Sequence, residues 1–439
     1  MGNVDFVKKH NYGTWSVQKD WNPLHIVDAE GCYFTDSNNN NYLDFSSQAV
    51  CSNLGHKNKN IIDAIANQAE NLSYVAPWFT TNIRAELSKL LVDVYPDGLN
   101  KFFFSTSGTE ANEAAFKIAR MYTGKYKIIS RYSSYHGSTP GSISATGDLR
   151  RWTHEKYSKT DGFIFGPECN CYRCPFNMDQ DSCNVQCVEY FDYMLRNEMN
   201  VAAIIIEPIV GTNGVLIPPD TYLPRLKEIC NKHNVLLILD EVMTGWGRTG
   251  EWFACNHWNK IPDIITTAKG STSAYAPLGI TATSEKIASF FDDNMFSHGH
   301  TYESHPLLLA TAKATIEEMI RLNINQNSTE MGIYLGESLK NLKSKHKSIG
   351  DIRGKGLFWA VEIVKDIENK TPFNTPIDKY ENKNILTNQI CKEMMNSGVY
   401  MFSWISHFIL APPLIIGKKD IDFAVSVFDK CLNIADEML

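Results

Sequence analysis

The feature that most constrains the fold of this chain is a series of short apolar runs, each of which ends in small or polar residues. Runs of about four to eight apolar residues are typical of strands buried on both faces of a sheet. Stretches with helical character separate the runs, so the sequence predicts an α/β fold with a parallel sheet. The runs and their polar ends are residues 102–104 before 105–109, 127–131 before 135–137, 201–206 before Glu207, 235–239 before Asp240, and 264–265 before Lys269.

The chain has 439 residues, which is enough for more than one domain. After residue 325 the pattern changes to two amphipathic helices, at 332–346 and 420–439, with a strand between them. The first residues contain strand-like pieces, and we expect them to pack with the C-terminal part. The sequence therefore predicts an N-terminal segment over residues 1–60, a large domain over residues 61–325 and a small α+β domain over residues 326–439.

The composition excludes several classes of protein. Hydrophobic residues make up 43% and charged residues 21%, an ordinary globular mix. The net charge of -7 argues against a surface that coats nucleic acid, and no apolar run approaches the ~20 residues of a membrane helix. Residues 1–20 lack the apolar core of a secretory signal, and the eleven cysteines are odd in number. We therefore expect a cytoplasmic protein with reduced thiols and with no nucleic-acid or membrane partner.

Ligands of open parallel sheets bind beyond the carboxyl ends of the strands, where all of these polar clusters are expected. The first cluster, Ser107, Gly108 and Thr109, would bring small residues to the start of a helix. The free N–H groups of a helix start and its positive dipole end form an anion site, most often for phosphate. The alternative is a simple helix cap, with Ser107 or Thr109 as the capping residue.

Lys269, Asp240 and Glu207 follow three other runs. A lysine at a strand end inside a cleft can lose its charge by burial and become a nucleophile that forms a Schiff base. The alternative is an ordinary surface lysine. A buried carboxylate such as Asp240 needs a partner, and a cationic ring nitrogen would be suitable. The alternative for Asp240 is a helix cap or a pair with an arginine such as Arg248, and Glu207 has the same two interpretations.

Two further patterns carry less weight. Residues 245–250 match G-x-G-x-x-G, but the match is separated from its strand, so we interpret it as a glycine-rich turn. A second pattern places five cysteines, Cys169, Cys171, Cys174, Cys183 and Cys187, in one insert. Zinc sites use such C-x2-C pairs, but this spacing gives no clean set of four ligands. We therefore expect no metal here and interpret the insert as a loop of reduced, partly buried thiols.

A phosphate site, a Schiff-base lysine, a buried aspartate and the aromatic ring of Tyr135 would meet at neighbouring strand ends. Pyridoxal phosphate needs a partner for its phosphate, its aldehyde, its pyridine nitrogen and its ring face. The combination of the four sites predicts a pyridoxal 5'-phosphate enzyme more strongly than any one of them does.

The sequence resembles the class III, or ω-amino-acid, aminotransferases from about Trp15 to Leu439. The resemblance implies fold type I: a mainly parallel seven-stranded sheet between helices in the large domain, and a smaller α+β domain built from both chain ends. The stretches that carry it are Leu54-Gly55-His56, Ser107 to Glu113, Ser134 to Gly137, Glu207-Pro208, Asp240-Glu241-Val242, Gly247 to Gly250, Ala268-Lys269-Gly270, Pro277-Leu278-Gly279, Thr301-Tyr302, His305-Pro306, Arg353 to Leu357 and Pro412-Pro413-Leu414.

The resemblance also implies roles for the residues of the site. Lys269 would hold the cofactor as a Schiff base and move the proton between substrate and cofactor carbons, and Asp240 would keep the pyridine nitrogen protonated. Tyr135 and Val242 would cover the two ring faces, and Ser107, Gly108 and Thr109 would bind the phosphate. Thr301 would reach the phosphate of the neighbouring subunit in a homodimer, with tetramers left open. His136 and Glu207 would lie near the cofactor, and the substrate pocket would include Trp15, Trp78 and Phe402.

The sequence departs from the family pattern at two places that bear on the substrate. Met243 stands where many members have a glutamine, and residues 401–407 lack the arginine with which many members bind a carboxylate. Either another arginine serves, or the substrate is apolar at that end. The expected reaction is transfer of an amino group from an ω-amino acid or amine to a keto acid, with pyruvate as the expected acceptor. An aminomutase, racemase or decarboxylase on the same scaffold is the alternative.

Overall fold

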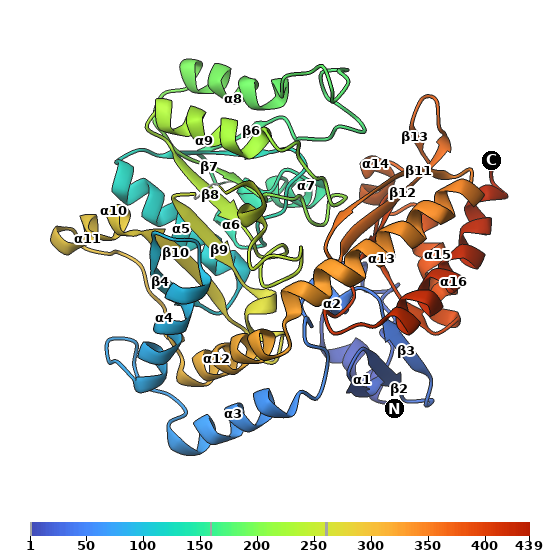
Figure 1. The fold of residues 1–439 in the computed structure, drawn as a ribbon, viewed down its shortest axis with the longest axis horizontal. Helices are drawn as coiled ribbons and strands as arrows, with labels where there is room; N and C mark the ends of the chain where they lie inside the picture. The colour runs from blue at the N-terminus through green and yellow to red at the C-terminus, as the bar shows by residue number, and fades with distance from the viewer. Residues whose placement is uncertain (1, 159, 260–261) are drawn as a thin grey trace.

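The computed structural model describes residues 2–158, 160–259 and 262–439. A seven-stranded sheet forms the centre of the larger part (Figure 1). Its strands run parallel except β10, which pairs antiparallel with both of its neighbours. In spatial order they are β4 (Leu99–Ser105), β10 (Gly279–Ser284), β9 (Ile264–Thr267), β8 (Leu236–Asp240), β7 (Val201–Ile206), β5 (Lys127–Arg131) and β6 (Phe163–Gly166).

The continuous apolar runs bury side chains on both faces of this sheet. Ile205 and Ile238 belong to the core on one face, together with Phe116 of α5, whereas Ile204 and Leu237 belong to the core on the other. Successive strand residues point to opposite faces, so an apolar run without alternation requires cover on both sides. The helices of this part are α3 (Lys59–Asn71), α4 (Asn82–Val94), α5 (Gly108–Thr123), α6 (Pro140–Ala145), α7 (Leu149–Glu155), α8 (Gln186–Asn197), α9 (Tyr222–Lys232), α10 (Glu285–Ala288), α11 (Phe290–Asp293) and α12 (Pro306–Arg321), with short 3-10 turns η1 (Ala254–Trp258) and η2 (Lys269–Thr272).

The smaller part, on the right in Figure 1, packs helices against a second sheet in the order β11-β12-β16-β15, with β13 paired to β12. Its first helix, α13, is longer than the sequence predicts and begins at Ile324. The elements are α13 (Ile324–Lys345), β11 (Ile349–Lys355), β12 (Phe358–Asp366), β13 (Thr371–Pro372), α14 (Pro376–Tyr380), α15 (Leu386–Asn396), β14 (Val399–Tyr400), β15 (Phe402–Trp404), β16 (His407–Leu410) and α16 (Lys418–Asp436).

The two ends of the chain meet in a third sheet, with the order β1-β2-β3-β14. Leu43 of β3 pairs with Val399 of β14, and the two strands run parallel. This confirms that the smaller part is built from both chain ends; the boundaries at residues 60 and 325 stay a prediction. The N-terminal elements are α1 (Asn3–His10), β1 (Ile26–Glu30), β2 (Tyr33–Asp36), β3 (Asn41–Asp44) and the short α2 (Ser47–Val50).

Arg248, in the predicted glycine-rich turn, joins these parts. Its side chain is fully buried, and its guanidinium donates four hydrogen bonds over 2.6–3.1 Å. The acceptors come from the N-terminal segment and from the smaller part, so one cation connects three stretches of chain. They are the carbonyl oxygens of Leu357 and Pro412, Ser47 Oγ and Asn53 Oδ1.

We predict that Arg248→Met lowers the free energy of unfolding by about 3 kcal/mol, because four buried acceptors lose their donor. Denaturant unfolding measures this change. Arg225→Met is the matched control, because Arg225 forms ion pairs with Glu189 and Glu228 on the surface and little change is expected there. Equal stability of the two variants would contradict the role given to Arg248.

Candidate active site

Three of the predicted residues lie together at the carboxyl edge of the large sheet. Asp240 is the last residue of β8, and it stands opposite Thr266 of the neighbouring strand β9, three residues before Lys269. Glu207 directly follows β7, whose Ile206 pairs with the residue before Asp240. Because these strands are adjacent and parallel, their ends bring the two carboxylates and the amine to one place.

Asp240 is buried, with 3% of its surface exposed, and is held by three donors. Its Oδ2 accepts a hydrogen bond from Asn112 Nδ2 and contacts His136 Nδ1, both at 2.8 Å, and its Oδ1 accepts one from the Val242 N–H at 3.0 Å. Asn112 and His136 are also buried, and Nε2 of His136 has no hydrogen-bond partner among the described residues. Asp240 therefore does not pair with Arg248, as one alternative held, and its orientation is fixed by neutral or titratable groups.

Lys269 begins the short turn η2 in a left-handed conformation, with φ of 49°. Burial lowers the pKa of its ammonium, and the nearby Cys51, Asp240 and Glu207 oppose that shift. No hydrogen bond to the Lys269 side chain is found within the described residues. A lysine with a lowered pKa has a larger fraction of free amine at neutral pH, which is the form that attacks an aldehyde.

Glu207 is buried and receives two backbone N–H groups. Its Oε1 accepts a hydrogen bond from the Tyr135 N–H at 3.1 Å, and its Oε2 accepts one from the Gly211 N–H at 2.7 Å. Burial raises the pKa of this carboxyl, and Asp240 adds to the rise, while His136 is the main group that opposes it. The side chain thus connects the Tyr135 loop to the end of β7.

The start of α5 is both a capped helix and an open anion site. Ser107 is the N-cap residue, and its Oγ accepts a hydrogen bond from the Glu110 N–H at 3.3 Å, which confirms the capping interpretation. No described residue accepts a hydrogen bond from the N–H groups of Gly108 and Thr109. A side chain at Gly108 would lie 2.9 Å from Cγ2 of Val242, so only glycine lets the helix start approach the residues that follow β8.

Arg150, which the sequence did not single out, is the cation of this site. It is the second residue of α7, and its guanidinium lies 3.7 Å from the ring centre of Tyr135 and 4.6 Å from that of Trp404. Its Nε donates to Asp148 at 3.0 Å and its Nη2 also contacts that carboxylate, whereas no described residue accepts from Nη1. Arg150 therefore covers one face of the Tyr135 ring and has a free donor. Its signal in the sequence was only its place after the Tyr135 loop.

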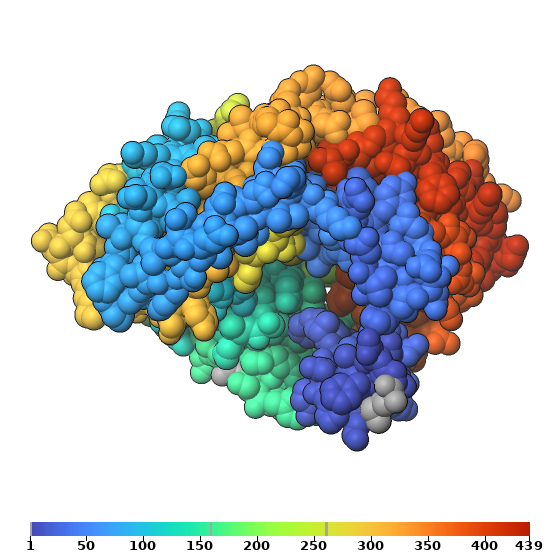
Figure 2. All heavy atoms as spheres, turned by 90° about the horizontal axis from the view of Figure 1, so that it is seen from below, coloured from blue at the N-terminus to red at the C-terminus, as the bar shows by residue number. Residues whose placement is uncertain are grey.

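The remaining predicted residues lie apart from Lys269 in the single chain. Thr301 is exposed in a turn, where its carbonyl oxygen accepts a hydrogen bond from the Tyr74 hydroxyl at 3.0 Å. Trp78 is 81% exposed, and Trp15 is 62% exposed on the N-terminal segment, which projects from the surface in dark blue in Figure 2. Phe402, in contrast, packs against the cluster that contains Trp404 and so lies near Arg150.

Two other expectations have structural outcomes. The sulfur of Met243 accepts a hydrogen bond from Thr212 Oγ1 at 3.6 Å, so the residue that replaces the family's glutamine faces the loop after β7. All eleven cysteines are free thiols. Among residues 2–158, 160–259 and 262–439, no group of three or more His, Cys, Asp or Glu side chains is placed to hold a metal ion.

The side chains present fit pyridoxal phosphate. The two unpaired N–H groups at the start of α5 suit its phosphate, and the unbonded amine of Lys269 suits its aldehyde. The buried carboxylate of Asp240 suits a protonated ring nitrogen, because a buried charge needs an opposite charge beside it. The second face of Tyr135 and the side chain of Val242 remain for contact with the ring.

Comparisons with known proteins support the same assignment. The class III aminotransferase family matches residues 14–432. The taurine–pyruvate aminotransferase of Bilophila wadsworthia is 35% identical over 98% of this chain and 96% of its own length. A taurine:2-oxoglutarate aminotransferase from Bifidobacterium kashiwanohense, solved with pyridoxal phosphate and glutamate, is 36% identical and superposes with a TM-score of 0.94 over 99% of this chain and 97% of its own.

A relative with another reaction is also similar. The leucine/methionine racemase of Thermococcus litoralis is 35% identical over 79% of this chain and 79% of its own length. The fold and the residues at the sheet edge are therefore shared by enzymes with different outcomes, while the family match covers nearly the whole chain. This chain belongs to the class III family of pyridoxal-phosphate-dependent aminotransferases.

Proposed function

We propose that this aminotransferase takes the amino group from an ω-amino acid with an anionic far end and gives it to a keto acid, with pyruvate as the preferred acceptor. The observation that carries the proposal is Arg150, a cation with a free donor beside the ring of Tyr135. The ω-amino acids in question have a carboxylate or a sulfonate at the end opposite the amine, as β-alanine and taurine do. The taurine aminotransferases among the relatives support this class of donor.

In this proposal each residue of the sheet edge has one task. Lys269 Nζ binds the aldehyde and later carries a proton away from the donor's amine-bearing carbon. Asp240 holds the proton of the ring nitrogen, with His136 and Asn112 fixing its orientation. The N–H groups of Gly108 and Thr109 bind the phosphate, with Ser107 as the cap that orders them. Bound pyridoxal phosphate supplies the electron-withdrawing ring that stabilises negative charge on the substrate carbon.

Arg150 answers the question raised by the missing arginine before Pro412. A guanidinium binds carboxylate or sulfonate oxygens with charge-assisted hydrogen bonds, which are stronger than neutral ones. The Asp148 carboxylate holds Nε and Nη2, and Asn213 Nδ2 donates to the same carboxylate at 3.1 Å, so the guanidinium has a fixed position. Since Nη1 remains free, we infer that it binds the acid group of the donor and of the acceptor in turn.

The test is a half-reaction with a single donor and no keto acid. The yellow enzyme is mixed with taurine or β-alanine, and the absorbance of the cofactor is followed. A transaminase stops after one turnover with an aminated cofactor, and pyruvate then restores the original spectrum and yields alanine. Failure of every ω-amino acid to bleach the cofactor, while a simple amine does so, would refute the proposed substrate class.

The second candidate is a racemase, which the similarity to the leucine/methionine racemase favours. A racemase returns the proton to the same carbon, so it turns over without an acceptor and loses no amino group. Incubation with L-leucine or L-methionine and no keto acid separates the two, because continuous loss of optical rotation occurs only with a racemase.

We predict that Arg150→Leu raises KM for taurine and β-alanine roughly 10- to 100-fold, because a charge-assisted hydrogen bond is lost. For an uncharged amine such as 1-phenylethylamine, KM should change little. Arg151→Leu is the matched control: Arg151 is the next residue of α7, but its guanidinium pairs with Glu155 and lies over Phe165. An equal rise in KM for charged and uncharged donors would contradict the role of Arg150.

We infer further that the enzyme works as a homodimer in the cytoplasm. Thr301 is surrounded by exposed aromatic side chains, including Trp78 and Tyr302, the latter 59% exposed. Exposed apolar patches of this kind are typical of protein interfaces. The free thiols support a reducing compartment. Sedimentation gives the number of subunits, and an aspartate at Thr301 should dissociate the dimer if this surface forms the contact.

A further inference from the structure

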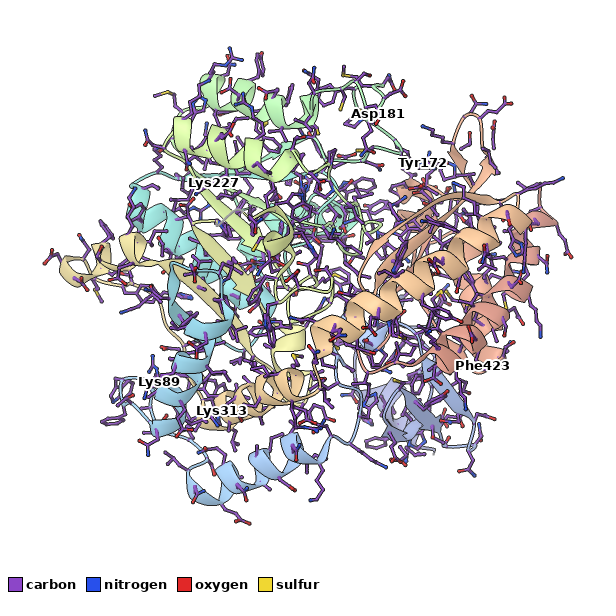
Figure 3. The ribbon with its side chains drawn as sticks, in the orientation of Figure 1. Lys89, Tyr172, Asp181, Lys227, Lys313 and Phe423 are labelled. Carbon is purple, nitrogen blue, oxygen red and sulfur yellow. The ribbon has the colours of Figure 1, made fainter. Side chains whose placement is uncertain are left out.

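The insert between β6 and α8 carries five of the eleven cysteines. Figure 3 labels Tyr172 and Asp181 on it, with Tyr172 on the side that faces β11–β13. The Tyr172 carbonyl oxygen accepts a hydrogen bond from Lys370 Nζ at 2.9 Å, and Arg173 donates to Glu362 Oε1 at 2.6 Å and 2.8 Å. The insert thus connects the large sheet with the smaller part of the molecule.

Three thiols of the insert are in contact. Cys169 is buried, with 3% of its surface exposed, and its thiol lies within hydrogen-bonding range of both Cys171 and Cys187. Cys174 and Cys183 line the same small cavity, but they have no recorded contact with Cys169. Cys169 is therefore the common neighbour of two half-buried thiols.

Cys187 has the surroundings of a reactive thiolate. It is the second residue of α8, a twelve-residue helix whose N-terminal end favours negative charge. The hydrogen bond from Cys169 lowers its pKa, and the guanidinium of Arg131 contributes in the same direction. Arg131 and Tyr222 are each 1% exposed, and within the described chain Arg131 Nε and the Tyr222 hydroxyl have no hydrogen-bond partner. Two unpaired buried donors beside the thiols suit an anion.

Cys171 is the competing thiol. The hydrogen bond with Cys169 lowers its pKa to about 7, but Asp351 opposes its ionisation. It lies on an irregular loop rather than at a helix start, so only Cys187 combines a helix N-terminus with a buried guanidinium.

We propose that Cys187 and Cys169 form a redox-active dithiol that peroxide converts to a disulfide. The Cys187 thiolate attacks one oxygen of hydrogen peroxide; an S–O bond forms, the O–O bond breaks, and the departing hydroxide takes a proton to become water. Sγ of Cys169 then attacks the Cys187 sulfur; the S–S bond forms, the S–O bond breaks, and the second hydroxide leaves as water with the Cys169 proton. The two thiols lose two electrons and the peroxide gains them.

Oxidation at this place would reach the active site through Arg131. Its Nη2 donates to the carbonyl oxygen of Glu207 at 2.5 Å, and its own carbonyl oxygen accepts a hydrogen bond from Ser134 beside Tyr135. A disulfide removes the thiolate charge that faces this guanidinium and shortens the insert, so we expect slower turnover that a thiol reductant reverses.

The test begins with peptide mapping of the purified holoenzyme after peroxide treatment and alkylation. Trypsin leaves Cys169 and Cys171 on one peptide, residues 160–173, and Cys187 on another, residues 174–196. The expected result is a reducible cross-link between these two peptides. The cross-link should persist in Cys171→Ser and in the matched control Cys174→Ser, and it should be lost in Cys169→Ser and Cys187→Ser.

Several outcomes would overturn the proposal. A disulfide within residues 160–173, or no disulfide at all, would remove Cys187 from the chemistry. Loss of the cross-link in Cys171→Ser with retention in Cys169→Ser would assign the bond to another pair. Stoichiometric zinc in the purified enzyme, with thiols that resist peroxide until a chelator is added, would identify a metal site instead. Because mapping needs no turnover, the result is independent of the substrate proposed above.

Discussion

Replacement of Lys269 by alanine should lower kcat by at least about 1000-fold, because the variant loses both the amine that binds the aldehyde and the group that moves the proton. The amine is buried, its pKa is lowered by that burial, and no described residue bonds to it. No other group at the sheet edge can replace it. Kinetics with a saturating donor and keto acid measure the loss.

A second readout separates lost chemistry from lost cofactor. Borohydride reduction of the holoenzyme should fix the cofactor to the peptide that contains Lys269, and the Lys269→Ala variant should give no such adduct. A small primary amine added to the variant should restore part of the activity. Lys89→Ala, on the exposed side of α4, is the matched control and should behave as the unchanged enzyme. Full activity of Lys269→Ala would remove the central residue of the proposal.

The second large effect is expected at Asp240. Asp240→Asn keeps the size of the side chain but removes the only negative charge that β8 brings to the site, and kcat should fall on the order of 100- to 1000-fold. The new amide nitrogen would also face Asn112 Nδ2, which now donates to Oδ2 at 2.8 Å. The proton on the ring nitrogen would be lost, so the absorbance of the bound cofactor should shift as well.

The matched control for this variant is Asp263→Asn. Asp263 directly precedes β9 at the opposite edge of the sheet, where it pairs with Lys227 at 2.7 Å. The same substitution there should leave kcat and the cofactor spectrum unchanged. If Asp240→Asn kept both as well, the carboxylate would not act on the ring.

The sheet edge could be predicted because backbone geometry alone brings strand ends together. Asp240 and Lys269 follow apolar runs that no water-exposed strand would have, and adjacent parallel strands then fix their proximity. Strand β10 escaped prediction because its sequence, Gly279–Ser284, has three hydroxyl side chains and no apolar run, although all but its last residue are buried. Thr281 is satisfied there by a hydrogen bond to the Ala111 carbonyl oxygen, which no local pattern indicates.

Arg150 and Thr301 show two further limits of the sequence. The position of Arg150 depends on Trp404, which is more than 250 residues away and reaches the site only because β15 folds against α7. Thr301 is exposed in the single chain, so its predicted role depends on a second subunit and cannot be read from one chain. Ser107 is different: the cap and the anion site are compatible, since its side chain caps the helix while the next two N–H groups stay free.

The pairing of β3 with β14 has a consequence for synthesis on the ribosome. Leu43 leaves the ribosome long before its partner Val399 exists, so the N-terminal strands must wait while most of the chain is made. The large sheet uses only residues 99–284 and can form during that time. The unpaired edge of β3 is therefore exposed on the nascent chain, and a chaperone that shields it would raise the yield of active enzyme.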